Sequence, residues 1–237
     1  MGYEDPLMYL PHKAVQTFVR RQSIYDFQRP ASHLYLVIRG RVKIINTVED
    51  GCQIIARIVR AEGLFGESCL VLSQPAGEAV ALDNVTLMAW TPTDIEQQVE
   101  REPRLGLALT QYMVRTCIEL LDRIESMAAY NTPQRVMLAL AQLAIELGTK
   151  MPDGTVRLQS LTHHTIAEYV GTSREIVSLE MNRLRRLGVL SYSRKHIDVY
   201  REAIEDDLRQ HGITLPYAHH RSVVPPANQA WMTTSSR

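Results

Sequence analysis

Residues 162–186 read THHTIAEYVGTSREIVSLEMNRLRR, and this stretch predicts two short helices joined by a tight turn. Thr162 is a favourable N-cap, because its hydroxyl can accept a hydrogen bond from a free backbone N–H of the first turn. Gly171 can adopt the left-handed conformation that ends the first helix. Apolar residues at helical spacing give that helix one inward face: Ile166, Ala167 and Val170.

The second helix of the pair opens with side chains that can read bases. Thr172 or Ser173 can cap it, and Arg174 and Glu175 stand on its exposed first turn. Its inward face is expected to contain Ile176, Val177 and Met181 or Leu184. In a helix-turn-helix this first turn enters the major groove, where Arg can donate to guanine and Glu can accept from cytosine. The alternative is an ordinary helix pair with solvated charges, but the cap, the glycine turn and the Ser-Arg-Glu opening occur together and favour duplex DNA.

The segment LSYSRKHIDVY (190–200) predicts a wing of two short strands around a basic tip. Arg194 and Lys195 lie at this tip and can rest on phosphate, while Ile197 and Val199 alternate inward. Between Arg174 and Lys195 there are six basic and two acidic residues, whereas the whole chain has 26 of each. A localised basic face on a neutral chain favours docking on DNA in one orientation.

The N-terminal half predicts short antiparallel strands that form a small barrel or roll. Gly40 interrupts an alternating run, and Asp50-Gly51 is a strong signal for a two-residue hairpin turn. Strands are expected at residues 34–38, 42–45, 54–59, 79–82 and 87–90.

The middle of the chain predicts a short helix at 93–99 and a long helix that begins near Arg104. One stripe of the long helix has the spacing of a heptad seam: Met113, Cys117, Leu120, Ile124 and Met127. A second stripe is available to pack on the chain's own domains: Leu109, Val114, Ile118 and Leu121. The first stripe therefore predicts a parallel homodimer, with two recognition helices roughly 34 Å apart and an inverted repeat as the target. Pro133 marks a new helix start and a domain boundary.

Four segments resemble the Crp/Fnr family of bacterial transcription regulators: HLYLVIRGRVK (33–43), GLFGES (63–68), IAEYVGTSREIV (166–177) and LRRLGVLSYSRKHIDVY (184–200). The resemblance covers residues 30–212 and implies an α+β fold. It implies an N-terminal antiparallel, jelly-roll-like β-roll of the cyclic-nucleotide-binding type (1–103), a long central dimerisation helix (104–131) and a C-terminal winged helix-turn-helix domain (132–212). Residues 213–237 are expected to be a disordered tail, since they are rich in Pro, Ser and Thr without periodicity.

By this resemblance the chain is a sequence-specific regulator that binds double-stranded DNA as a homodimer and, if it activates transcription, contacts RNA polymerase. The expected base contacts are Arg174, Glu175, Ser178 and Leu179. The expected phosphate contacts are Thr162, His163, His164, Thr172, Ser173, Arg194 and Lys195. Leu179 stands where the family commonly has Arg, so contact with a thymine methyl group is the expected substitute. The alternative function is a ligand-sensing or partner-binding module that does not bind DNA, and Arg174, Glu175 and the basic wing argue against it.

The resemblance also implies a possible effector pocket in the roll. In cAMP-binding relatives a Gly-Glu pair opens a short helix whose amides hold the cyclic phosphate, while the Glu holds the ribose. The matching residues here, with two from the long helix, are Gly66, Glu67, Ser68, Leu120 and Leu121.

Three departures from the cAMP-binding pattern predict another effector or none. Gly77-Glu78 stand at the ungapped positions of the Arg-Ser or Arg-Thr pair that neutralises the phosphate, so the charge of Glu78 is expected to repel the ligand. The turn before Gly66 is one residue short, and Leu120-Leu121 replace the small hydroxyl residues that meet adenine. Arg57 or Arg60 is the alternative source of the missing positive charge.

Composition narrows the class of protein further. No apolar run approaches the roughly 18 to 20 residues of a membrane helix and no secretory signal is visible, so a cytoplasmic location is expected. No enzyme motif is recognised, which predicts a non-enzymatic protein. Cys52, Cys69 and Cys117 are too few and too scattered for an iron cluster, and the adjacent His163-His164 diverge by about 100° on a helix, so neither a metal nor another cofactor is predicted.

Overall fold

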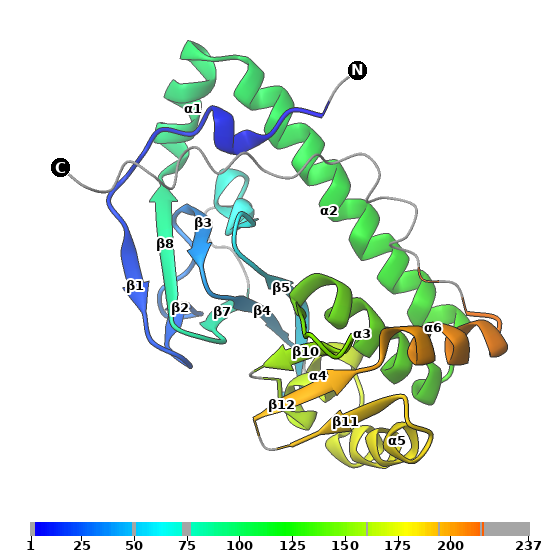
Figure 1. The fold of residues 1–237 in the computed structure, drawn as a ribbon. Helices are drawn as coiled ribbons and strands as arrows, with labels where there is room; N and C mark the ends of the chain where they lie inside the picture. The colour runs from blue at the N-terminus through cyan, green and yellow to red at the C-terminus, as the bar shows by residue number, and fades with distance from the viewer. Residues whose placement is uncertain are drawn as a thin grey trace.

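A computed structural model describes residues 3–48, 51–72, 77–159, 161–193, 195–213 and 215. The N-terminal part is an antiparallel β-roll of two facing four-stranded sheets, in the orders β1-β8-β3-β6 and β2-β7-β4-β5 (Figure 1). Its strands are β1 (Gln16–Phe18), β2 (Ser23–Tyr25), β3 (Leu34–Arg39), β4 (Val42–Thr47), β5 (Gln53–Val59), β6 (Leu64–Phe65), β7 (Glu78–Ala81) and β8 (Val85–Trp90). The roll and all five expected strands are confirmed, and β1, β2 and β6 were missed because they are too short to show alternation.

Side chains from both sheets fill the roll. The core includes the stacked rings of Tyr25, Tyr35 and Phe65, with ring centroids 5.0 to 6.2 Å apart. The expected turn between β4 and β5 includes Asp50, which lies outside the described residues.

The expected role of Glu78 as a charge that repels a ligand was wrong. Along β7 the buried side chains are Ala79 and Ala81, which belong to the core of the roll. Side chains alternate between the faces of a strand, so Glu78 lies on the opposite face, beside Ile45 of β4 in the register. Its charge is therefore not directed into the roll.

Two helices follow the roll. α1 (Pro92–Arg101) begins with a capping box formed by Thr91 and Asp94, and α2 (Arg104–Ala129) begins at the expected residue. Figure 1 shows α2 passing the roll and ending beside the C-terminal domain. No helix in the described part of the chain is long and apolar enough to cross a membrane.

The face of α2 that packs on its own chain was predicted wrongly except at Leu109, which packs against the apolar cluster that contains Trp90 and Tyr112. Val114 and Leu121 of the expected stripe are 54% and 56% exposed. The buried face is instead Leu105, Ala108, Tyr112 and Thr116. A pattern of apolar residues does not reveal this face, because it includes the polar residues Tyr112 and Thr116. The Tyr112 hydroxyl can be buried because it donates to the Leu64 carbonyl (3.0 Å) and accepts from the Leu64 N–H (2.8 Å).

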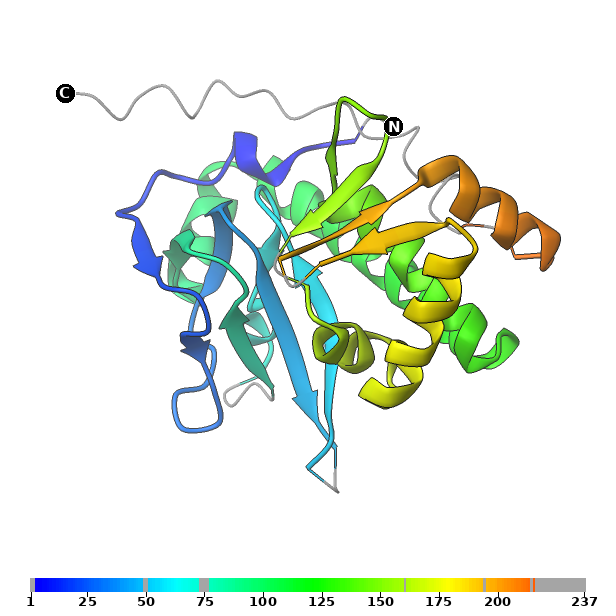
Figure 2. The ribbon, with the colours of Figure 1, turned by 60° about the horizontal axis from the view of Figure 1, so that its bottom comes forward.

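The C-terminal domain is a winged helix-turn-helix, as expected. Its elements are α3 (Thr132–Leu147), β9 (Thr149–Lys150), β10 (Val156–Gln159), α4 (His163–Val170), α5 (Arg174–Arg186), β11 (Leu190–Tyr192), β12 (His196–Val199) and α6 (Arg201–Gln210). The strands form one sheet in the order β11-β12-β10-β9. Figure 2 shows α4 beside the β4–β5 pair, and Ile45, Ile55 and Ile58 of the roll share one apolar cluster with α3 and α4.

Candidate nucleic-acid interface

The two N-caps and the glycine turn that the sequence predicts for the helix-turn-helix are all present. The Thr162 hydroxyl accepts from the Thr165 N–H (3.1 Å), and Ser173 caps α5 by accepting from the Ile176 N–H (3.4 Å). Gly171 has φ 71° and ψ 54°, the left-handed region that favours glycine. The N–H groups of Gly171 and Thr172 both donate to the Ala167 carbonyl, at 2.9 and 3.1 Å, which turns the chain sharply into α5.

The two helices pack through small and branched apolar side chains. Ile166, Ala167 and Val170 of α4 are buried, as are Val177, Met181 and Leu184 of α5. Ile176 was expected in this core and is 40% exposed. It lies about 100° around the helix from Val177, whose spacing with Met181 and Leu184 defines the buried face.

The base-reading residues share the outer face of α5. Arg174 and Glu175 are exposed, and Leu179 is 69% exposed. Two hydrogen bonds to the Glu175 carboxylate lower its pKa. The backbone N–H of Glu175 has the larger effect, and the Ser173 hydroxyl has the smaller one. The Glu175 carboxylate is therefore a charged acceptor at neutral pH, as cytosine recognition requires.

Ser178 belongs to the same face, but its hydroxyl is engaged within the protein. Nδ1 of His163 lies 2.9 Å from Oγ of Ser178, and the His163 ring meets the Tyr192 ring edge-on at 5.1 Å. Burial, and then the nearby Arg174 charge, lower the pKa of His163. The His163 ring is therefore largely uncharged at neutral pH, and it connects α4 with α5 and with the wing.

The wing is a short β11–β12 turn held by Ser193. The Ser193 hydroxyl accepts from the N–H groups of Lys195 (3.2 Å) and His196 (3.3 Å), which leaves the Lys195 side chain exposed. Arg194 lies outside the described residues. The Tyr192 hydroxyl donates to Oδ1 of Asn182 at 2.9 Å, which fastens the wing to α5.

The remaining expected phosphate contacts lie at the two helix starts. His164 is the second residue of α4, and 70% of its side chain is exposed. Thr172 and Ser173 precede α5, and Ser173 is exposed. Most of the expected contact residues that the structure describes are exposed, whereas His163 and Ser178 bond to each other.

The expected effector pocket is occupied by the protein's own side chains. Gly66 has φ 81°, and a Cβ there would lie 2.5 Å from the His33 carbonyl oxygen, so the Gly-Glu turn requires glycine. Glu67 opens a single 3-10 turn, Glu67–Leu70, and its carboxylate accepts from Arg57 at 3.0 Å. The Glu67 carboxylate, which the resemblance assigns to ribose binding, is therefore paired with Arg57 of the same chain.

Arg57 holds the centre of this region and was singled out in the sequence only as an alternative. Its guanidinium also donates to the Thr116 hydroxyl (3.2 Å) and the Leu64 carbonyl (2.9 Å). Burial is the largest single influence and opposes the Arg57 charge, but the groups around it, Glu67 first and then Tyr112, Glu119 and Tyr25, together raise the pKa of the guanidinium above its usual value. Thr116 and Tyr112 were missed altogether, since a lone hydroxyl on a helix carries no periodic signal.

Leu120 and Leu121 do not face this pocket within the chain. They are 41% and 56% exposed, on the same open side of α2 as Ile124 and Met127. Arg60 also lies outside the pocket, donating to the Glu146 carbonyl at 3.4 Å.

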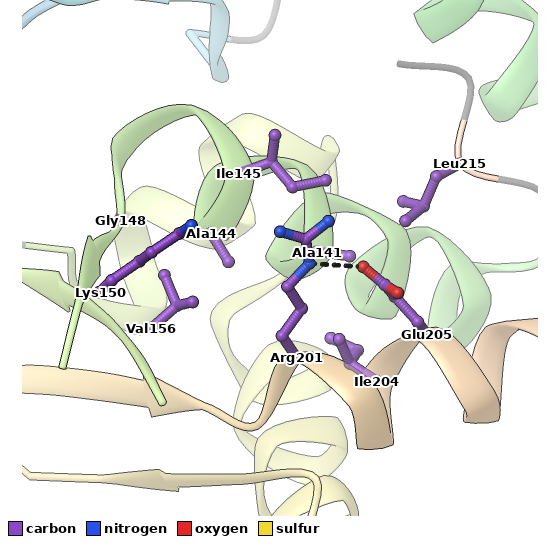
Figure 3. A pocket seen from close by; sticks show the side chains of 10 residues that line it. All are labelled: Ala141, Ala144, Ile145, Gly148, Lys150, Val156, Arg201, Ile204, Glu205 and Leu215. Atoms are coloured by element: carbon purple, nitrogen blue, oxygen red, sulfur yellow. Dashed lines mark hydrogen bonds and ion pairs between the residues drawn. The ribbon is translucent and has the colours of Figure 1, made fainter. Parts of the chain in front are cut away.

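A separate cavity of about 110 Å³ lies between α3, β9–β10 and α6 (Figure 3). Two of its charged lining residues pair with each other, since Nε of Arg201 donates to Glu205 at 2.7 Å. Among the described residues no group of three or more His, Cys, Asp or Glu could hold a metal ion.

Comparison with known proteins agrees with this architecture. The family described as "Cyclic nucleotide-binding domain" matches residues 15–102, and the family described as "Crp-like helix-turn-helix domain" matches residues 134–203. The β-roll thus matches one family and the C-terminal domain, called the head from here on, matches a DNA-binding family. This combination defines the class of the protein as a transcription regulator.

Two curated relatives and one solved structure illustrate the similarity. The global nitrogen regulator of Synechocystis is 29% identical over 78% of this chain and 84% of its own length. A CRP-like cAMP-activated global transcriptional regulator of Mycobacterium tuberculosis is 26% identical over 68% of this chain and 72% of its own. A CRP-family regulator from Thermus thermophilus has the same fold, with a TM-score of 0.70 and 23% identity, over 84% of this chain and 98% of that one. The chain belongs to the Crp/Fnr family of DNA-binding transcription regulators.

Proposed function

We propose that this regulator binds an inverted repeat as a homodimer, with α5 of each subunit in a major groove. The observation that carries the proposal is the exposed, capped start of α5, where Arg174 and Glu175 project side by side. Arg174 would bond O6 and N7 of guanine, and Glu175 would accept from N4 of a neighbouring cytosine. Leu179, one turn further on, would meet a thymine methyl group.

Phosphate contacts would fix the head on the duplex. Thr162 and His164 at the start of α4, Thr172 and Ser173 before α5, and Lys195 on the wing all lie where a backbone can approach. His163 and Ser178 would act through each other, since their hydrogen bond sets the position of α5 against α4.

The dimer would form along α2. Its open side is apolar over several turns, with exposed Val114, Leu120, Leu121, Ile124 and Met127. Met113, the first residue of the expected seam, packs partly on its own domain. The remaining seam residues, with Cys117 among them, are free to meet the same residues of a second subunit.

We also propose that the effector is not cAMP, or that the protein needs none. The pairing of Glu67 with Arg57 supports this, because cAMP would have to displace one partly buried partner from the other. Similarity alone does not select an effector, since one relative is named for cAMP and another for nitrogen. Residues 1–103, 104–131 and 132–212 would be the sensing, dimerisation and DNA-binding parts, in a cytoplasmic protein that contacts RNA polymerase if it activates.

A gel shift with fragments of the source genome tests this function. Purified protein should retain a small subset of fragments in excess competitor DNA, without added ligand. The Glu175→Ala variant should lose this selectivity while it stays folded. Uniform retention of all fragments, or of none, would contradict the proposal.

A further inference from the structure

The DNA-binding head is joined to the roll by a buried ion pair. Nζ of Lys43, on β4, lies 3.0 Å from Oε2 of Glu168, on α4. Only 15% of the Lys43 side chain and 5% of the Glu168 side chain are exposed. The other Glu168 oxygen lies 3.4 Å from Nε2 of His164 on α4 itself, so Lys43 is the partner that ties Glu168 to the roll. Removing Lys43 takes away this cross-domain partner of a buried carboxylate, so the contact tolerates little displacement of one domain against the other.

A second link starts from the dimerisation helix. Arg123 of α2 donates through Nη1 to the Ala56 carbonyl of β5 at 2.6 Å, and through Nη2 to the Tyr169 carbonyl of α4. Its guanidinium also lies 4.5 Å from the centroid of the Tyr169 ring. One side chain therefore connects α2, the roll and the first helix of the head.

Further contacts make this junction specific. Arg41, held by Asp83 at 2.6 Å, donates to the Gln159 carbonyl just before α4 at 3.0 Å. Around these polar contacts, Ile45, Ile55 and Ile58 of the roll pack into the apolar cluster of the head. Planar guanidinium contacts and a paired buried charge permit one relative orientation, whereas apolar packing alone would permit several.

The junction does not cover the outer face of α5, which contains the expected base contacts. Arg174, Glu175 and Leu179 are exposed while Glu168 is buried against the roll. Arg123 is also the neighbour of Ile124, which is 61% exposed on the proposed dimer face. On this turn of α2, Ile124 would meet the second subunit, while Arg123 on the other side bonds to the head.

We propose that Arg123 and the Lys43–Glu168 pair are positioning residues that lock the head to the roll and to α2, and so set the spacing between half-sites that the dimer accepts. The inference rests on the homodimer of the proposed function. With the lock in place, each α5 has one position relative to the two-fold axis. Without it, the head can turn on the segment between α2 and α3 and follow half-sites at other spacings.

Operators that differ by single base pairs between the half-sites test the lock, because each added pair moves a half-site by about 3.4 Å and rotates it by about 35°. Binding would be measured for wild type, Arg123→Leu, Lys43→Met and the Lys43→Met/Glu168→Gln double variant. The double variant removes both buried charges, so it stays testable if a single variant does not fold. Lys13→Met is the matched control, since Lys13 forms an ion pair of 2.8 Å with Asp94 inside the N-terminal part.

Wild type and Lys13→Met should prefer one spacing over its neighbours, and in the lock variants this preference should fall about tenfold or more. Sedimentation should show dimers throughout, and affinity for a single half-site should change little. A folded, dimeric double variant with the wild-type spacing preference would overturn the lock. A monomeric wild-type protein would instead overturn the homodimer on which the lock depends.

Discussion

Nδ1 of His163 lies 2.9 Å from Oγ of Ser178, and this contact joins the start of α4 to the middle of the recognition helix. Because burial lowers the pKa of His163, the unfolded chain takes up a proton before the folded domain does. The contribution of His163 to the free energy of unfolding is therefore fully present above about pH 6.5 and is lost as the pH falls from there through the lower, folded-state pKa.

Thermal unfolding between pH 5 and 8 measures this loss. His163→Phe keeps a ring beside Tyr192 but cannot titrate, so its melting temperature should fall less than that of wild type over this window. Parallel curves for the two proteins would show that His163 does not carry the pH dependence.

Arg174→Ala should weaken binding to the cognate half-site by roughly 1 to 3 kcal/mol and relax the preference at one base only. Affinities for the four base variants at that position provide the measurement. Arg186→Ala removes one charge from the far end of the same helix and is the control, which should weaken all four alike. A strong guanine preference opposite Leu179, where the chain has no donor side chain, would contradict the assigned register.

Lys195→Ala should weaken binding to every sequence by a similar factor, because a wing lysine meets phosphate and not bases. The slope of log affinity against log salt should fall by about one unit. An unchanged slope would place Lys195 away from the DNA.

Ile124→Asp should dissociate the dimer. It places a carboxylate opposite its symmetry mate on the apolar face of α2, where burial and like charge both oppose association. Sedimentation velocity measures the outcome. Val19→Asp, at a 65% exposed site in the turn between β1 and β2, is the control and should remain a dimer. A dimeric Ile124→Asp protein would place the interface elsewhere.

Calorimetry should detect no cAMP binding at low micromolar concentration. Micromolar affinity requires about 8 kcal/mol, and separating the partly buried Arg57–Glu67 pair would offset part of it. Low-micromolar binding that also switches on operator binding would mean that Arg57 turns from Glu67 to the cyclic phosphate.

The sequence predicted those parts of the fold that depend on neighbouring residues. The Thr162 cap, the Gly171 turn and the wing between β11 and β12 involve contacts over two to five positions, and the structure has all three. The alternation of residues 34–38 and 54–59 likewise predicted strands, because burial of one face repeats every second residue.

Contacts between distant residues could not be predicted in this way. Lys43 and Glu168 are 125 positions apart, and Arg57 and Thr116 are 59 apart. A buried charge has no period, so its partner becomes evident only when the fold brings the two together. The same reason explains the wrong face of α2, where Tyr112 and Thr116 are buried by virtue of their hydrogen bonds.

Selection of binding sites from a random duplex pool with the purified, ligand-free protein tests the central claim most directly. The account predicts an inverted repeat, with half-site centres about one helical turn apart, a guanine and a cytosine set by Arg174 and Glu175, and no strong guanine opposite Leu179. Enrichment of a single asymmetric site, or no enrichment at all, would contradict it.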